Sequence, residues 1–324
     1  MLPEGASIGL TVRVMRNGVQ CDSGSVRFAL QSGGSARYSD MALASAGCAY
    51  RFDGSGNSVT GLYTLFSYYL ETADFGTSYI DVVDRKTFDE FAAAASAVKV
   101  EKPEHLLFVG DSLTDFFRGY NYVDKLSFWL KLVHGDKVTL KNVGVGGDYV
   151  TRVWDRLNKV EGKAGKRANA YNAIYDPMPT HIFIFLGHND SKLTGESDYT
   201  ESFVPMAEFE ENYRKIVKKL RADTTAKITI VSAVSSVYEI TKAAVDKAKD
   251  KGKDKNLFGR PDVSERYNAA ARKMADELGC DYIDVYTPTR DHSEKRSLFV
   301  GDGVHINSRG NALVAMEILK YLGR

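Results

Sequence analysis

The amino-acid sequence predicts an α/β protein whose main part is a parallel sheet, preceded by a small all-β domain. First, short apolar runs alternate with helical patterns from about residue 104 onward. Second, apolar residues recur at every second position before residue 85, as they do in half-buried strands. Third, a length of 324 residues favours two domains over one. We therefore expect domains at 1–84 and 104–324, joined by a helical linker at 85–103.

The segment 1–84 is predicted to form short antiparallel strands. Apolar residues alternate with polar or small ones over 8–14, and Asn17-Gly18 follows as a typical hairpin turn. The order of strands and turns resembles bacterial immunoglobulin-like domains, in the motifs Val-Arg-Val-Met-Arg-Asn-Gly-Val (12–19), Gly-Ser-Val-Arg-Phe (24–28), Gly-Leu-Tyr-Thr-Leu (61–65) and Ser-Tyr-Ile-Asp-Val-Val (78–83). This resemblance implies a small β-sandwich.

The linker at 85–103 is expected to contain a short helix. Thr87-Phe88-Asp89-Glu90 fits a capping box, because a Glu lies three residues after a Thr that would cap the helix. The alanine run that follows favours a helix.

The segment 104–324 is predicted to be the parallel α/β domain. Its strands are expected at the apolar runs 106–109, 182–186, 228–231 and 282–285, with a weaker run at 138–143. Helical patterns occur at 206–222, 263–278 and 308–322. Because reactive groups of such sheets lie at the carboxyl ends of the strands, polar motifs that directly follow a strand are the first candidates for a site.

Charge and hydropathy exclude several classes of function. The chain has 43 basic and 42 acidic residues, a formal net charge of +1, so nothing points to a nucleic-acid partner. No apolar run approaches the 18–20 or so residues of a membrane span, and the N-terminus lacks the pattern of a signal peptide. The Lys- and Asp-rich stretch 242–255 is interpreted as a solvated insertion.

The three cysteines give no metal-binding pattern. Cys21, Cys48 and Cys280 form no Cys-x-x-Cys pair and have no zinc-ligand spacing. Cys21 and Cys48 either form a disulfide in an oxidising compartment or are two small buried side chains.

Two short motifs supply the groups that an activated serine requires. Ser112 follows the apolar run 106–109, and His305 lies three residues after Asp302. A serine hydroxyl becomes a good nucleophile only when a base takes its proton. His305 is the expected base, and Asp302 is near enough in the chain to hold its imidazole in the correct tautomer. The pattern predicts acyl transfer to water, an esterase reaction.

The same reaction needs hydrogen-bond donors for the oxyanion of the tetrahedral intermediate. The expected donors are the backbone N–H of Ser112, a glycine N–H from the loop 142–148, and the side-chain amide of Asn189. Within that loop the candidate glycine is Gly147, or Gly146 if the register differs by one residue.

Together these motifs resemble the SGNH hydrolase superfamily, also called GDSL esterases and lipases. The matching blocks are Gly110-Asp111-Ser112-Leu113-Thr114-Asp115, Asn142-x-Gly144-x-x-Gly147-Asp148, Gly187-x-Asn189-Asp190 and Asp302-x-x-His305. The resemblance implies a flavodoxin-like three-layer α/β/α fold with no metal or organic cofactor. It also implies that Ser112 is the nucleophile, that Asp302 and His305 complete the triad, and that Gly147 and Asn189 help to form the oxyanion hole.

The sequence gives fewer indications of the substrate. His188, within Gly-His-Asn-Asp, resembles the form of this block in rhamnogalacturonan acetylesterases, and Asp148 and Tyr149 are further candidates for substrate contact. Asp148 either orients its loop or touches the substrate. Arg152 and Trp154 follow in the same segment, with packing as the expected role of Trp154.

We therefore expect a serine esterase that removes small acyl groups, acetyl first among them, from a small-molecule or polysaccharide ester. A lipase, lysophospholipase or thioesterase with the same triad is the alternative, and a non-catalytic adhesin module is a remote one. An immunoglobulin-like module is common in secreted or surface enzymes. The oligomeric state is left open.

Overall fold

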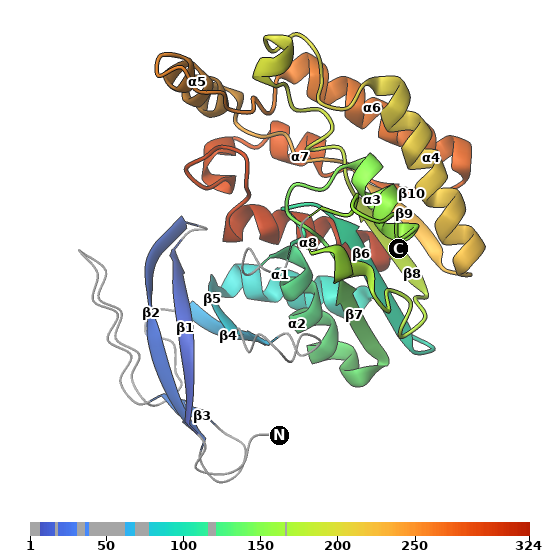
Figure 1. The fold of residues 1–324 in the computed structure, drawn as a ribbon. Helices are drawn as coiled ribbons and strands as arrows, with labels where there is room; N and C mark the ends of the chain where they lie inside the picture. Colours follow the sequence, from blue (N-terminus) through green and yellow to red (C-terminus); the bar gives the residue numbers. More distant parts are fainter. Residues whose placement is uncertain are drawn as a thin grey trace.

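A computed structural model describes residues 7–16, 19–30, 36–38, 62–68, 78–115, 121–165 and 167–324. For the strands before residue 85 the description covers the backbone alone. Figure 1 shows the arrangement of the elements along the chain.

The strands before residue 85 pair antiparallel, as the alternation of the sequence predicts. β1 (Ser7–Arg16), β2 (Val19–Leu30) and β3 (Ala36–Tyr38) form one sheet in that order, and β4 (Leu62–Tyr68) pairs with β5 (Ser78–Asp84). An immunoglobulin-like sandwich over 1–84 stays a prediction, as does the pairing of Cys21 with Cys48, because much of this segment lies outside the described residues.

The centre of the molecule is a five-stranded sheet in which all strands run parallel. Its strands are β6 (Glu104–Gly110), β7 (Val138–Asn142), β8 (His181–Phe185), β9 (Lys227–Val231) and β10 (Asp281–Ile283). The spatial order is β10-β9-β8-β6-β7. Counted along the chain, this is the 2-1-3-4-5 order of flavodoxin-like folds, so the predicted fold is confirmed.

Helices cover both faces of this sheet (Figure 1). They are α1 (Arg85–Ala97), α2 (Tyr122–His134), α3 (Val150–Leu157), α4 (Met206–Asp223), α5 (Tyr238–Lys249), α6 (Pro261–Leu278), α7 (Tyr286–Arg290) and α8 (Ser308–Leu322). Short 3-10 turns lie at Gly135–Lys137, Ala168–Tyr171, Gly195–Ser197 and Lys295–Leu298.

Alternate side chains of each strand enter opposite cores. On β6, Leu106 and Phe108 pack with α1, α2 and α8, whereas Leu107 and Val109 pack with α3, α4 and α6. All four side chains are at most 3% exposed. A parallel sheet buried on both faces favours apolar residues at most strand positions, which is why β6 and β8 contain the apolar runs 106–109 and 182–185.

The helix of the predicted linker begins at Arg85, so Thr87 lies inside the helix and does not cap it. Phe91 and Ala95 are buried in the first of the two cores, and the ring of Phe91 stacks on Trp129 of α2 with centroids 5.6 Å apart. The segment is therefore also part of the packing of the α/β layers. The division of the chain into domains at 85 and 103 stays a prediction.

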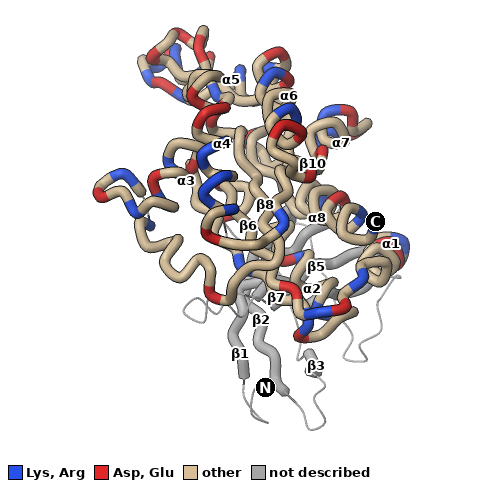
Figure 2. The backbone as a smooth tube through the Cα atoms, turned by 90° about the vertical axis from the view of Figure 1, so that its right-hand side faces the viewer, with Lys and Arg blue, Asp and Glu red and all other residues tan. Residues whose placement is uncertain are grey.

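Charged side chains of both signs are mixed along the surface helices. Lys and Arg alternate with Asp and Glu on α4, α5 and α6 (Figure 2). The Lys- and Asp-rich stretch 242–255 forms most of α5 and the turn after it, and most of its side chains are exposed. Within the described part of the chain, none of the helices is long and apolar enough to cross a membrane.

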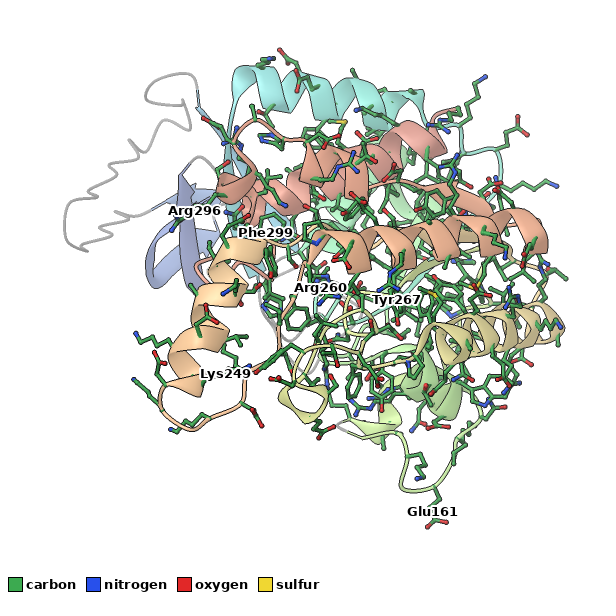
Figure 3. All side chains as sticks on the ribbon, turned by 90° about the horizontal axis from the view of Figure 1, so that it is seen from above. Glu161, Lys249, Arg260, Tyr267, Arg296 and Phe299 are labelled. Carbon is green, nitrogen blue, oxygen red and sulfur yellow. The ribbon has the colours of Figure 1, made fainter. Side chains whose placement is uncertain are left out.

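The loop after α3 extends away from the body of the molecule. Seen from above, Glu161 lies at its outer tip (Figure 3). The loop returns at Arg167, whose side chain forms an ion pair with Asp115 near the end of β6. The long connection between β7 and β8 is thereby attached to the carboxyl edge of the sheet.

Candidate active site

Three loops that are far apart in the sequence meet at the carboxyl edge of the sheet. Ser112 follows β6, Asn189 follows β8, and His305 precedes α8. β6 and β8 are neighbours in the sheet, so their ends lie side by side. The topology thus brings together the residues that the sequence singled out.

Ser112, His305 and Asp302 form a continuous chain of hydrogen bonds. Nε2 of His305 lies 3.0 Å from Oγ of Ser112, and Nδ1 of His305 lies 2.6 Å from Oδ2 of Asp302. An ionised carboxylate only accepts hydrogen bonds, so Nδ1 carries the proton and Nε2 is left to accept the serine proton. This is the geometry that a serine nucleophile and its base require.

The carboxylate of Asp302 is held in its ionised form. Burial raises its pKa, but hydrogen bonds from the His305 ring and from the backbone N–H groups of His305 and Val304 lower it more strongly. The net effect is a pKa well below the usual range. A carboxylate that stays charged can stabilise a protonated imidazole next to it.

The turn that carries Ser112 depends on close backbone packing. Oδ1 of Asp111 accepts the N–H of Leu113 at 2.9 Å, and the carbonyl of Asp111 accepts the N–H of Asp115 at 2.9 Å. Thr114 fits between Gly110 and Gly144, where a Cβ on either glycine would collide with it. Glycine is therefore required where β6 and the loop after β7 approach each other.

The structure distinguishes the two glycines that the sequence left open. The N–H of Gly146 donates to Oδ2 of Asp115 at 2.7 Å, so it already has an acceptor. Gly147 has a φ of +84°, and among the described residues its N–H has no partner, as is also true of the N–H of Ser112. The free donor in this loop is therefore Gly147.

Asn189 is held by the two loops beside it. Its side-chain amide donates to the carbonyl of Asp148 at 3.0 Å and, over a longer 3.3 Å, to Oδ2 of Asp111. The second contact is weak enough for the amide hydrogen to be shared with an incoming oxyanion. Asn189 thus links the serine loop to the glycine loop.

Asp148 is fully buried in an ion pair. Its two carboxylate oxygens accept Nε and Nη2 of Arg156 at 2.7 and 3.1 Å, and both side chains are 0% exposed. Burial raises the pKa of Asp148 to about 6, against the opposing effect of Arg156. Arg156 also donates to the carbonyl of Arg167 at 2.8 Å.

Two more carboxyl groups are buried beneath the site. Asp190 accepts the N–H groups of Val150 at 2.9 Å and of Gly187 at 3.1 Å, which joins the start of α3 to the end of β8. Burial raises the pKa of both Asp111 and Asp190 to about 7. Near neutral pH these two groups therefore carry less than their full charge.

The side chain of His188 is buried near His305 and Asp302. Its ring stacks on Phe258 with centroids 5.2 Å apart, and its Nε2 lies 3.5 Å from Oγ of Ser236. Burial, and the nearby charge of His305, lower its pKa to about 3. His188 is therefore neutral at physiological pH and presents no charge to a substrate.

The segment after Gly147 carries aromatic and basic side chains. Tyr149 packs edge-on against Phe203 with ring centroids 5.0 Å apart, and the Arg152 guanidinium lies over the Tyr149 ring at 4.8 Å. Trp154 packs against the second core, as expected. Sequence analysis missed Phe203 and Lys192, which lie in the loop after β8 and join this cluster only through the fold.

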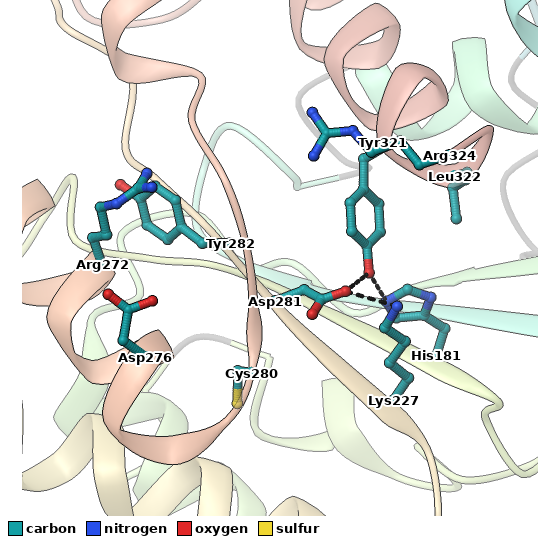
Figure 4. Close-up of a pocket in the computed structure, with 10 residues that line it drawn as sticks. All are labelled: His181, Lys227, Arg272, Asp276, Cys280, Asp281, Tyr282, Tyr321, Leu322 and Arg324. Carbon is teal, nitrogen blue, oxygen red and sulfur yellow. Dashed lines mark hydrogen bonds and ion pairs between the residues drawn. The ribbon is translucent and has the colours of Figure 1, made fainter.

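A separate pocket lies at the opposite, amino edge of the sheet (Figure 4). Its volume is about 510 Å³, and its lining includes His181, Lys227 and Asp281 at the starts of β8, β9 and β10. Here Tyr321 and Lys227 both bind Asp281. None of the candidate active-site residues lines this pocket.

Comparisons with known proteins place the chain in a family. Residues 108–313 match the model of the GDSL-like lipase/acylhydrolase family. The chain is 25% identical over 209 residues to the mouse isoamyl acetate-hydrolyzing esterase 1 homolog, a match that covers 60% of this chain and 81% of the relative. It is 23% identical over 149 residues to the Arabidopsis thaliana GDSL esterase/lipase CPRD49, of which the match spans 55%.

Solved structures show the same fold. A lipase/acylhydrolase from Enterococcus faecalis aligns with a TM-score of 0.50 at 17% identity, covering 68% of this chain and 95% of that one. A catalytic mutant of an acetylxylan esterase from Geobacillus stearothermophilus aligns with a TM-score of 0.51 at 19% identity, covering 70% and 97%. The family match spans more than half of the sequence, and the chain therefore belongs to the GDSL-like lipase/acylhydrolase family and is a carboxylic ester hydrolase.

Proposed function

We propose that the enzyme hydrolyses esters of small acyl groups, acetyl foremost, on a carbohydrate alcohol, with Ser112, His305 and Asp302 as its triad. The observation that carries the proposal is the hydrogen-bonded chain from Ser112 Oγ through His305 to Asp302, with distances of 3.0 and 2.6 Å.

The reaction follows from these positions. Oγ of Ser112 attacks the ester carbonyl while Nε2 of His305 takes its proton. The N–H groups of Ser112 and Gly147 and the amide of Asn189 stabilise the oxyanion. His305 then protonates the departing alcohol, and in the second half it activates the water that releases the acyl group.

Two observations support a small acyl group. Several relatives at 25–28% identity are isoamyl acetate-hydrolyzing esterase 1 homologs. In addition, three of the four side chains grouped beside the proposed oxyanion donors are polar or charged, namely Tyr149, Arg152 and Lys192, and Phe203 is the apolar member of the group. A long acyl chain would need an extended apolar groove there.

The test has two parts. A fluorophosphonate probe should label the wild type covalently and leave Ser112→Ala unlabelled, with circular dichroism showing that both are folded. Hydrolysis of p-nitrophenyl esters should fall steadily from two carbons to eight, and acetylated polysaccharide should release acetate. A maximum at eight carbons or more would contradict the small-acyl proposal, and a well-folded but unlabelled wild type would contradict the assignment of Ser112.

A further inference from the structure

Four side chains form a row beside the oxyanion donors. The ammonium of Lys192 lies 4.2 Å from the centroid of the Phe203 ring, Phe203 meets Tyr149 edge-on at 5.0 Å, and the guanidinium of Arg152 lies 4.8 Å from the Tyr149 centroid. We call these four residues the cation–aromatic row. It has a positive group at each end and two rings in the middle.

The row is attached to the loops that carry the proposed oxyanion hole. Tyr149 comes two residues after Gly147, and Lys192 comes three residues after Asn189. Arg152 also donates to the carbonyl of Gly147 at 3.3 Å, and its side chain passes close under Gly165. These contacts order Arg152 before any ligand arrives, which lowers the entropic cost of using it for binding.

Among the described residues, Lys192 has no ion pair, and the ion pair that Arg152 forms with Asp148 is long. The ammonium of Lys192 also makes no hydrogen bond to any described residue. Arg152 reaches only to 3.9 Å from Asp148, whose two oxygens already bind Arg156. Burial lowers the pKa of Lys192, and the nearby Arg152 lowers it further, while Asp190 opposes both. Two cations whose charges act on each other favour the binding of an anion beside them.

The rings add a second kind of contact. Phe203 is 38% exposed, a high value for a large apolar side chain next to a catalytic centre. Aromatic faces bind the C–H surfaces of sugars and other flat apolar surfaces. The row therefore combines an apolar contact with positive charge, and a neutral acetyl ester would use only the first.

We propose that the cation–aromatic row binds an anionic group, a carboxylate or a phosphate, on the alcohol part of the ester substrate. This inference rests on the proposed function: if the acyl group is small, a charged group near the row has to belong to the alcohol. The ammonium of Lys192 supplies a point charge, and the planar guanidinium of Arg152 can donate two parallel hydrogen bonds. Proteins bind carboxylates and phosphates with both kinds of group.

The experiment compares three acetyl esters of one sugar. They are mono-O-acetyl methyl glucoside, the corresponding glucuronoside with a free carboxylate, and the corresponding glucoside 6-phosphate. The wild type should hydrolyse one or both anionic esters with a kcat/KM about tenfold above that of the neutral ester, mainly through a lower KM. The carboxylate and phosphate arms show which anion is preferred.

Variants identify the residues responsible. Lys192→Met should reduce the preference for the anionic ester about tenfold, and Lys192→Arg should retain most of it. Lys218→Met is the matched control, because Lys218 is exposed near the far end of α4, and it should leave the preference unchanged. Raising ionic strength from 0.05 to 0.5 M should weaken the preference in the wild type as well, a measurement that needs no variant.

The outcomes separate the two proposals. Equal kcat/KM for neutral and anionic esters, or a preference that survives Lys192→Met and high salt, overturns the inference while the esterase assignment stands. If Ser112→Ala hydrolyses the neutral ester as fast as the wild type, the proposed function itself is wrong, and the inference falls with it.

Discussion

One carboxylate, that of Asp302, contacts both the ring and the backbone of His305. Oδ2 lies 2.6 Å from the ring nitrogen Nδ1, while Oδ1 accepts the backbone N–H of His305 at 3.0 Å and that of Val304 at 2.8 Å. The two residues are therefore fixed as a unit at the end of the loop before α8. A ring fixed in this way needs little reorganisation when it takes a proton.

The first prediction concerns this contact. Asp302→Asn removes the charge that stabilises the imidazolium and offers an amide that can hold the wrong tautomer, so kcat should fall by about 10³–10⁴. Steady-state hydrolysis of p-nitrophenyl acetate measures the change. Asp262→Asn, at an exposed carboxylate of α6, is the control and should keep wild-type activity. An activity loss below about tenfold for Asp302→Asn would remove Asp302 from the triad.

The second prediction concerns the oxyanion hole. Asn189→Ala removes one donor while Ser112 and His305 stay in place, so kcat should fall by about 10²–10³ with little change in KM. Asn158→Ala serves for comparison, because its amide only donates to the Trp154 carbonyl on the exposed side of α3. If KM rises and kcat is unchanged, Asn189 contributes to ground-state binding instead of to the transition state.

The third prediction concerns the buried ion pair beneath the glycine loop. Arg156→Met leaves the Asp148 carboxylate buried without its partner, which should lower the free energy of unfolding by about 3–5 kcal/mol. Urea denaturation followed by circular dichroism measures this. The double variant Asp148→Asn, Arg156→Met buries no charge and should be more stable than the single one. The pair is unimportant for stability if Arg156→Met unfolds at the wild-type midpoint.

The fourth prediction concerns pH. His181 is 6% exposed, and burial together with the positive charge of Lys227 lowers its pKa to about 3. The unfolded chain takes up a proton on this residue near pH 6.5. Between these two values the unfolded state binds more protons, so the contribution of His181 to stability is present above pH 6.5 and is lost as the pH falls.

His181→Gln keeps a hydrogen-bonding group near Thr229 but does not titrate. Relative to this variant, the wild type should lose up to about 1.4 kcal/mol of unfolding free energy per pH unit from pH 6 to pH 4. Urea titrations at pH 7.5, 6, 5 and 4 give the comparison. A difference between the two proteins that stays constant over this range would show that His181 does not have a lowered pKa.

Much of the site could be predicted because it is encoded locally. Ser112 and Asn189 each come shortly after an unbroken apolar run, and His305 and Asp302 are only three residues apart. The carboxyl ends of parallel strands lie at the same edge of the sheet. The fold class and the order of the motifs in the sequence therefore imply that these motifs lie close together.

The other features of the site depend on contacts between distant segments of the chain. No local sequence pattern indicates such contacts. Phe203 lies beside Tyr149 only because the loop after β8 folds back over the start of α3. Gly146 and Gly147 look alike in the sequence, and only the hydrogen bond from Gly146 to Asp115 distinguishes them. The buried ion pair of Asp148 with Arg156, eight residues further on, likewise has no sign in the sequence.

The position of α1 has a practical consequence for shortening the protein. A fragment cut at residue 104 would lose Phe91 and Ala95 and would uncover Trp129, which is 2% exposed in the complete fold. The side chain of Trp129 and its apolar neighbours would then form an exposed apolar patch, and such patches promote self-association. Expression of the hydrolase by itself should therefore start no later than Arg85, even though every motif of the reaction lies beyond residue 109.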